Sequence, residues 1–311
     1  MIPIRRIVAD LKASFAVGGI EAMSQTHSAA MNNSQIYRLL CGLVDLVFPA
    51  ATLLDIAKDL DRYVGELGVA GGSKAALDTL PISWQAELPR RGQDKIKTCP
   101  FIVFGQHGSI LTPFLVAASL DRPDLKMLGA SFVAKLGPNV ARSMYPVLLP
   151  MPTFRSAGRM GILPRIGGWL ASRLEPPVDK DAAKEQNRTS LIQAAEHVRD
   201  GGALLMAPDG RDPRAKWHLG LGYLVAHLAQ IEATDCSAYL VPFRIWASIT
   251  GIYRLLSRNP ILRALGRWQY RRPIRVAFGD PIPLSLVIEQ AGRDPAAITE
   301  HLETYYHSLG Y

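Results

Sequence analysis

The stretch Ile102–Phe114, with the sequence IVFGQHGSILTPF, connects a short apolar run to a helical pattern. The run, which ends at Phe104 or Gly105, is typical of a buried strand, and His107 follows it at once. In an open α/β sheet, ligands bind beyond the carboxyl ends of the strands. An imidazole at that place can act as a general base, because its ordinary pKa lies near neutrality. The alternative is a histidine that caps a helix or fills a core.

On both sides of this stretch, short apolar runs alternate with longer helical patterns. We predict buried strands at 101–104, 126–128, 147–149, 203–206, 239–243 and 274–278. Helical patterns occur at about 111–120, 132–145, 157–173, 182–199, 217–232 and 250–268. Strands that alternate with helices indicate an α/β architecture.

The first part of the chain has a different pattern. Residues 35–48 and 51–67 have helical periodicity, whereas residues 1–34 have little, and 27–34 are expected to be a loop. We therefore predict a helical, membrane-associating section at 1–90 and an α/β section at 91–311.

The charge balance limits the function classes. The 311 residues carry 35 Lys and Arg against 27 Asp and Glu, so the formal net charge is +8, and 48% of the residues are hydrophobic. This composition excludes a disordered chain. A positive excess is typical of binding to nucleic acid, to an anionic membrane or to an acidic small substrate, or it has no function. The mean hydropathy of +0.09 favours lipid over nucleic acid.

The positive charge is concentrated in two tracts, 125–174 and 236–279, which contain no Asp or Glu. In the second tract the arginines alternate with Trp246, Tyr253 and Trp268. Basic helices with aromatic and leucine residues bind anionic membrane surfaces. The alternative is a solvated basic face over a core face.

The cysteines and the first residues indicate the compartment. Cys41, Cys99 and Cys236 are far apart, which fits a reducing cytosol and predicts no metal site. Asp10 and Lys12 interrupt the stretch after the first arginines, so we expect no signal peptide.

The longest apolar stretch, Leu39–Ile56, contains Asp45 and Pro49. An aspartate at the bilayer centre costs about 2.5–3.5 kcal/mol on insertion scales. We therefore expect a core helix or a segment that lies in the membrane interface, and not a spanning helix.

A second predicted strand, 203–206, runs into the segment Asp209–Arg214, DGRDPR. Guanidinium groups bind phosphate with two hydrogen bonds, and glycine lets the backbone approach a ligand closely. The segment is therefore either a phosphate site or a simple turn.

In this order, the segments resemble the glycerolipid acyltransferase family, which includes 1-acylglycerol-3-phosphate acyltransferases. The family's first motif, H-x-S-x-x-D-P-F, is matched at His107, Ser109, Pro113 and Phe114. Four later segments are similar to the family's P-E-G-T-R, F-K-x-G, V-P and V-x-F-G-x-P-I patterns: Pro208–Arg211, Lys216–Gly220, Leu240–Phe243 and Val276–Ile282. Arg155 lies about where the second motif has its arginine. The resemblance covers roughly residues 95–285.

The resemblance implies a fold, a reaction and a place in the cell. The fold would be a mixed, mostly parallel sheet flanked by helices, with the N-terminal helical section beside it. A fatty acyl group would move from acyl-CoA or acyl-carrier protein, as co-substrate, to a hydroxyl of a lysophospholipid or glycerol phosphate, with no cofactor or metal. The protein would sit on the cytoplasmic face of an anionic membrane, as a peripheral or monotopic protein.

The resemblance also assigns roles to residues of this sequence. His107 would be the base, and Asp209 would position a group in the site. The substrate and its phosphate would be bound by Ser109, Arg155, Gly210, Arg211 and Arg214.

Thr112 stands where the family has aspartate. A threonine can hydrogen-bond but supplies no charge to support an imidazolium. Three explanations are open. Another carboxylate, for which Asp209 is the candidate, orients His107, or His107 and Thr112 form a weaker catalytic pair. In the third, catalysis is lost and lipid binding is kept. Thr112 would then serve as the N-cap of a helix at 113–120.

Three rival functions remain. A hydrolase would need a G-x-S-x-G nucleophile elbow, which the sequence lacks. Nucleic-acid binding has only the arginines of 244–275 in its favour, without a recognised signature, so we expect no nucleic-acid partner. A non-catalytic lipid-binding protein is favoured by Thr112.

Overall fold

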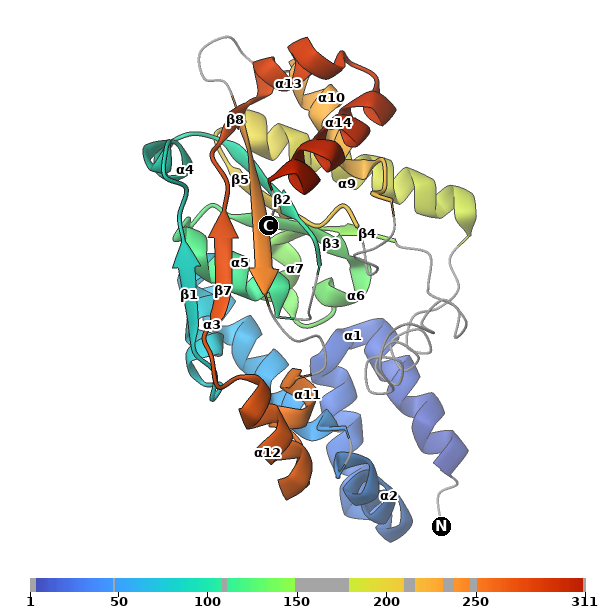
Figure 1. Cartoon of the computed structure of the whole chain (residues 1–311). Helices are drawn as coiled ribbons and strands as arrows, with labels where there is room; N and C mark the ends of the chain where they lie inside the picture. The colour runs from blue at the N-terminus through green and yellow to red at the C-terminus, as the bar shows by residue number, and fades with distance from the viewer. Residues whose placement is uncertain are drawn as a thin grey trace.

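The computed structural model describes residues 4–46, 48–107, 111–148, 179–209, 216–231, 238–246 and 251–309. Within these residues the fold is a mixed, mostly parallel sheet flanked by helices, with helices at the start of the chain (Figure 1). This confirms the predicted fold class.

The sheet has eight strands: β1 (Trp84–Glu87), β2 (Phe101–Gly105), β3 (Lys126–Ala130), β4 (Met144–Val147), β5 (Ala203–Met206), β6 (Tyr239–Trp246), β7 (Ile274–Phe278) and β8 (Ile282–Pro283). Their order is β1-β7-β6-β2-β5-β3-β4, and β8 pairs with β6. Strands β6, β2, β5, β3 and β4 run in one direction, whereas β1 and β7 run in the other. The carboxyl ends of β2, β5 and β6 therefore lie at one edge, which we call the catalytic edge.

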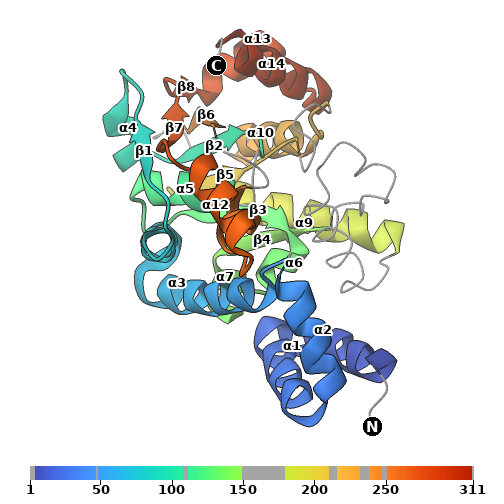
Figure 2. The same cartoon turned by 60° about the horizontal axis from the view of Figure 1, so that its bottom comes forward.

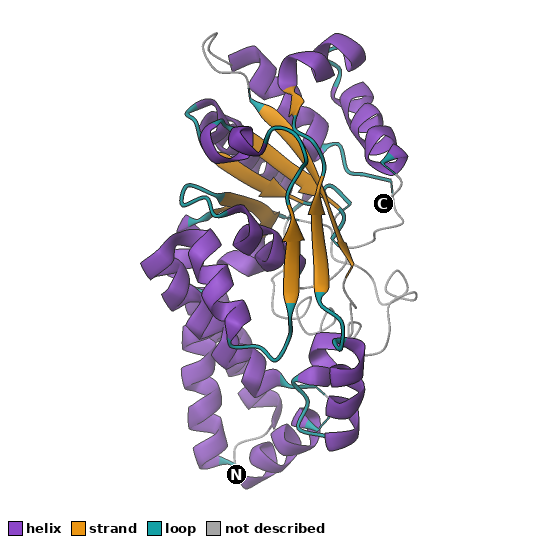
Figure 3. Ribbon diagram, turned by 60° about the vertical axis from the view of Figure 1, so that its left-hand side comes forward, coloured by secondary structure: helices purple, strands orange, loops and turns teal. Residues whose placement is uncertain are grey.

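Helices cover both faces of the sheet (Figure 3). In β2, Phe101 and Val103 point into one core and Ile102 and Phe104 into the other, as the period of two requires. The first core is closed by α3 (Ala50–Asp78) and α5 (Thr112–Leu120), and the second by α9 (Lys180–Arg199), α10 (Gly220–Ile231), α13 (Leu284–Ala291) and α14 (Pro295–Ser308). Burial on both faces explains why these strands are continuous apolar runs.

The remaining helices are α1 (Ile4–Asn33), α2 (Gln35–Asp45), α4 (Gln93–Thr98), α6 (Ser131–Ala134), α7 (Pro138–Arg142), α11 (Gly251–Leu255) and α12 (Pro260–Gln269). Side-chain caps define several starts. Ser34 accepts a hydrogen bond from Tyr37 N at the start of α2, and Asn259 does the same for α12, where Pro260 takes the first position.

Several expectations for the elements are wrong. Residues 4–33 form α1, broken at Gly18 and Gly19, although their periodicity is weak. The single helix expected at 132–145 is instead α6, α7 and the start of β4, because Gly137-Pro138 interrupts it, and β4 lies three residues before the predicted strand. The helix expected at 157–173 lies outside the described residues.

The predicted division at residue 90 stays a prediction about folding units, but the two sections share structure. Strand β1, at 84–87, is parallel to β7, and Leu60, Val64 and Leu77 of α3 join the same core as Phe101. The first section therefore contributes to the sheet and to its core.

Among the described helices, no single one is both long and apolar enough to cross a bilayer. The stretch Leu39–Ile56 is split between α2 and α3, which pass that test only as a pair and bend by 83° where they meet. The stretch is therefore not one continuous helix, and its expected place in a core or in the membrane interface stays a prediction.

Candidate active site

The candidate site lies where β2 and β5 end at the catalytic edge. The two strands are parallel neighbours, with Phe104 opposite Met206. His107 lies three residues beyond Phe104, and Asp209 lies three residues beyond Met206. The pairing therefore brings together two residues that are 102 positions apart in the chain.

A close approach of backbones shapes the end of β2. A Cβ atom on Gly105 would collide with the carbonyl oxygen of Phe243 in β6. Only glycine fits between the two strands at this position. Gly105, two residues before His107, can therefore pair with Phe243 of β6 at the last residue of β2.

The carboxylate of Asp209 holds the main chain of His107. The amide N of His107 donates to both Oδ1 and Oδ2, at 2.9 Å each. Asp209 is only 1% exposed, whereas His107 is partly exposed. A buried carboxylate is costly unless it is hydrogen-bonded, so this contact fixes the loop after β2 against the loop after β5.

The structure thus places Asp209 beside His107, as predicted, and shows its carboxylate bound to the backbone amide of His107. That Asp209 also orients the imidazole ring stays a prediction.

Thr112 is the first residue of α5 and is 1% exposed. The expectation that it is the N-cap is wrong, because Leu111 holds that position and makes no side-chain cap. Pro113 is therefore the second residue of the helix, where its missing N–H leaves no intrahelical hydrogen bond unmade.

Residues on either side of 210–215, which lie outside the described residues, are held by hydrogen bonds. Asp209 accepts from the amide of His107, and His218 N donates to Pro208 O at 2.8 Å. Trp217 is 5% exposed and packs edge-on against Phe104, with the ring centroids 5.8 Å apart. The sequence interpretation missed this anchor, although a tryptophan within six residues of the arginines was a visible signal.

The five predicted phosphate-binding and substrate-binding residues, Ser109, Arg155, Gly210, Arg211 and Arg214, lie outside the described residues. Their roles stay predictions. Among the described residues, no group of His, Cys, Asp and Glu side chains could hold a metal ion.

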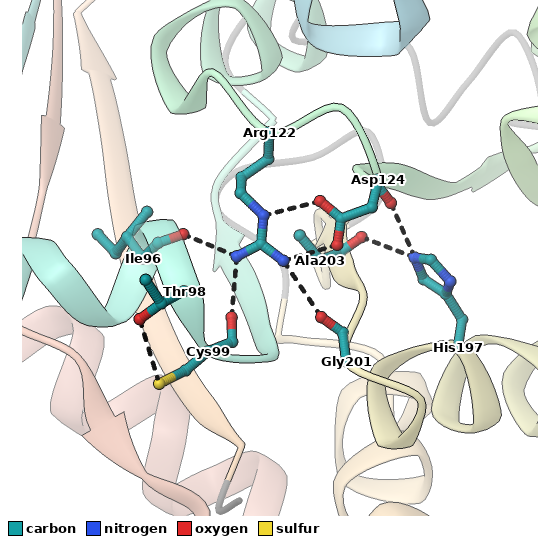
Figure 4. Close-up of polar contacts among 8 residues, drawn as sticks. All are labelled: Ile96, Thr98, Cys99, Arg122, Asp124, His197, Gly201 and Ala203. Atoms are coloured by element: carbon teal, nitrogen blue, oxygen red, sulfur yellow. Dashed lines mark hydrogen bonds and ion pairs between the residues drawn. The ribbon is translucent and has the colours of Figure 1, made fainter.

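A second polar cluster lies at the opposite edge of the sheet, where β3 and β5 begin (Figure 4). Arg122 is 7% exposed, and its guanidinium forms a bidentate ion pair with Asp124. Nε lies 2.7 Å from Oδ1, and Nη2 lies 2.6 Å from Oδ2. The guanidinium also donates to the carbonyl oxygens of Ile96, Cys99 and Gly201. Arg122 therefore joins three chain segments, which is a structural role.

His197 belongs to the same cluster. Its Nε2 lies 3.0 Å from Asp124 O and 3.2 Å from Ala203 O, so this nitrogen carries the proton. Burial, and then the charge of Lys126, lowers the pKa of His197. A cavity of about 640 Å³ lies here, lined by Lys126, Tyr145 and Glu196 among others, and it is remote from His107 because it faces the amino ends of the strands.

Comparison with known proteins gives a distant similarity to a solved structure. No protein-family model matches the chain, and no curated protein matches it. A solved structure, the 1-acyl-sn-glycerophosphate (LPA) acyltransferase PlsC from Thermotoga maritima, is similar, with 15% sequence identity and a TM-score of 0.40, over 88% of this chain and 94% of that chain. This similarity is too distant to establish a family for the chain.

Proposed function

We propose that this protein is an acyltransferase that moves a fatty acyl group from acyl-CoA or acyl-carrier protein to a hydroxyl of a lysophospholipid or glycerol phosphate. The observation that carries the proposal is the junction of His107 with the buried carboxylate of Asp209 at the carboxyl ends of β2 and β5. There, the segment that resembles the family's first motif meets the segment that resembles its phosphate motif.

In the proposed reaction, the His107 imidazole removes the proton from the acceptor hydroxyl. The oxygen attacks the thioester carbonyl carbon, and the tetrahedral adduct collapses with loss of the thiolate, which takes up a proton from the imidazolium. Arg155, Arg211 and Arg214, with Ser109 and Gly210, would bind the phosphate and the substrate. The chemistry needs neither a metal nor a cofactor.

The role of Asp209 in this proposal is to hold the catalytic histidine in place through its backbone. Much of the rate enhancement of an enzyme comes from correct placement of its catalytic groups, and a displacement of about 1 Å can lower the rate by a factor of about 10². Thr112 supplies no charge, so we expect slower turnover than in a relative with aspartate at that position.

The experiment is an assay of the purified protein with labelled acyl-CoA or acyl-carrier protein against a panel of lysophospholipids and glycerol 3-phosphate. We expect an acylated product with at least one donor and acceptor pair. The absence of product across both donors and the whole panel would contradict the proposal.

The second candidate is a lipid-binding protein without catalysis, which Thr112 favours. It predicts that the chain binds a lysolipid, measured by calorimetry, in a preparation that gives no product with either donor.

The proposed location, for either function, is the cytoplasmic face of an anionic membrane.

A further inference from the structure

Helix α2 turns its apolar side outward. Six large apolar residues of α2 and its C-cap are exposed, and Leu39 is 67% exposed: Ile36, Leu39, Leu40, Leu43, Val44 and Leu46. The residues that face the protein are Tyr37 and Asp45, which are buried. A surface helix of a soluble domain normally has the opposite arrangement, with its apolar stripe against the core.

Helix α12 repeats this arrangement. Ile261, Leu265 and Trp268 are 71%, 45% and 61% exposed, and their spacing of four and three residues places them on one stripe. The inner side of α12 packs tightly, because a Cβ atom on Gly266 would collide with the backbone of Leu255. The exposed stripe therefore belongs to a helix whose position is fixed.

Contacts at the end of α2 connect it with α11 and α12. Ser257 Oγ donates to Leu46 O at 3.0 Å, and Arg258 forms an ion pair with Asp45 at 3.7 Å. Phe48 stacks on Tyr253, with the ring centroids 5.5 Å apart. In two views α2 and α12 both lie away from α13 and α14 (Figures 1 and 2).

The charges around the two helices are positive. No Asp or Glu occurs at 22–44 or at 236–279, and Asp45 is paired with Arg258. Arg271 lies over the Trp268 ring at 5.0 Å. The exposed arginines of these segments are Arg38, Arg258, Arg263, Arg267, Arg271, Arg272 and Arg275, of which Arg275 is paired with Glu87. Such a surface is complementary to anionic lipid, whereas two copies of it would repel each other.

The strand directions relate this surface to the catalytic edge. Strand β6 runs parallel to β2 and leads from Phe243, opposite Gly105, toward α11 and α12. Helices α11 and α12 therefore come after the end of β6 that lies at the catalytic edge, where His107 also lies.

We propose that α2 and α12 form one docking face, made by Ile36, Leu39, Leu43, Ile261, Leu265 and Trp268, that seats the protein on an anionic lipid bilayer. The apolar side chains enter the boundary between head groups and acyl chains, and the arginines contact the phosphates. The docking directs the catalytic edge toward the lipid. Delivery of an acceptor to His107 in this way rests on the proposed function, whereas the docking does not.

The test is flotation of the full chain with phosphatidylcholine vesicles that contain or lack phosphatidylglycerol. Leu39→Glu and Ile261→Glu, one on each helix, are each expected to lower the partition constant by about 10-fold or more, since each removes an aliphatic side chain that the bilayer would bury. Arg267→Gln is expected to lower it about fivefold, and only with phosphatidylglycerol. Leu286→Glu on α13, whose residue is 38% exposed, is the matched control and should bind as the unchanged protein does.

The proposal is overturned if the unchanged protein binds neither vesicle, or if Leu39→Glu and Ile261→Glu bind as Leu286→Glu does. It is also overturned if the unchanged protein is a dimer by light scattering that Leu39→Glu dissociates, because the face would then be occupied by a second copy. Glycerol 3-phosphate, a water-soluble acceptor, separates the two proposals. If neither it nor any lysophospholipid of the panel is acylated with either donor while vesicle binding persists, the proposed function has failed and the docking face stands.

Discussion

The two edges of the sheet each hold a histidine next to an aspartate, but the contacts differ. At the edge where β3 and β5 begin, the ring of His197 is hydrogen-bonded to two carbonyl oxygens, and Asp124 is paired with Arg122. At the catalytic edge, Asp209 holds the main chain of His107. A half-buried histidine beside a cavity is therefore not by itself evidence of an active site. The strand end on which it lies and the atoms that its neighbours bind are what distinguish the two.

The comparison is tested most strongly by removing each histidine in turn. We expect His107→Ala to lower the turnover of acyl transfer by about 10²–10⁴-fold, because a general base contributes that much. His197→Ala should leave turnover unchanged and lower only stability. Steady-state rates and denaturation of both variants measure this. Equal turnover in the two variants would remove the distinction between the edges.

The next effect concerns the structural cluster. Arg122→Met removes five hydrogen bonds from a nearly buried guanidinium and leaves Asp124 without its partner. We expect a loss of about 3 kcal/mol in the free energy of unfolding, with the turnover of the folded protein unchanged. Urea denaturation measures it. The control is Arg199→Met, whose ion pair with Asp200 is exposed to solvent, so we expect this variant to unfold at nearly the same urea concentration as the unchanged protein.

Asp209→Asn probes the catalytic edge more finely. The amide keeps one acceptor for the His107 N–H but loses the charge, so we expect about 1 kcal/mol lower stability and about tenfold lower turnover, with the KM of the acyl donor unchanged. A change in stability with no change in turnover would reduce Asp209 to a structural residue.

The smallest effect is the pH dependence from His197. Burial, followed by the charge of Lys126, lowers its pKa in the folded chain below the ordinary value of 6.5. As the pH falls below 6.5, the unfolded chain takes up a proton that the folded chain does not, so stability decreases. We expect His197→Gln to make this decrease shallower by roughly half a kcal/mol per pH unit, because the ring is partly exposed to solvent.

His27 has a pKa lowered mainly by burial too, so part of the slope should persist in that variant. Denaturation at several pH values between 5 and 7 measures both slopes. An unchanged slope in His197→Gln would show that its ring is not neutral in the folded chain.

The elements that sequence predicted best are those buried on both faces. Strands β5 and β7 match their predictions residue for residue, since ALLM and the apolar core of IRVAF have no other place in a fold. Strand β1, WQAE, was missed because it is a short edge strand with mostly exposed side chains. Asp209 was expected near His107 because each follows a predicted buried strand, and the observed pairing of β2 with β5 places the two strand ends side by side.

Other parts of the site could not be derived from the sequence. Which atoms of His107 the carboxylate binds depends on the path of the loop, which no residue pattern specifies. The Arg122 cluster was missed because its acceptors at Ile96, Cys99 and Gly201 come from separate segments. All three are backbone carbonyl oxygens, which no side-chain pattern in the sequence reveals.

Strand β1 has a consequence for any shortened form of this protein. It covers the outer side of β7 along Ile274–Ala277. A chain that begins at residue 91 would leave the N–H and C=O groups of β7 that face β1 without partners and would also uncover the apolar surface that α3 occupies. Such an open, apolar sheet margin recruits strands from other molecules, so the shortened chain should aggregate even though it retains every residue of the proposed active site.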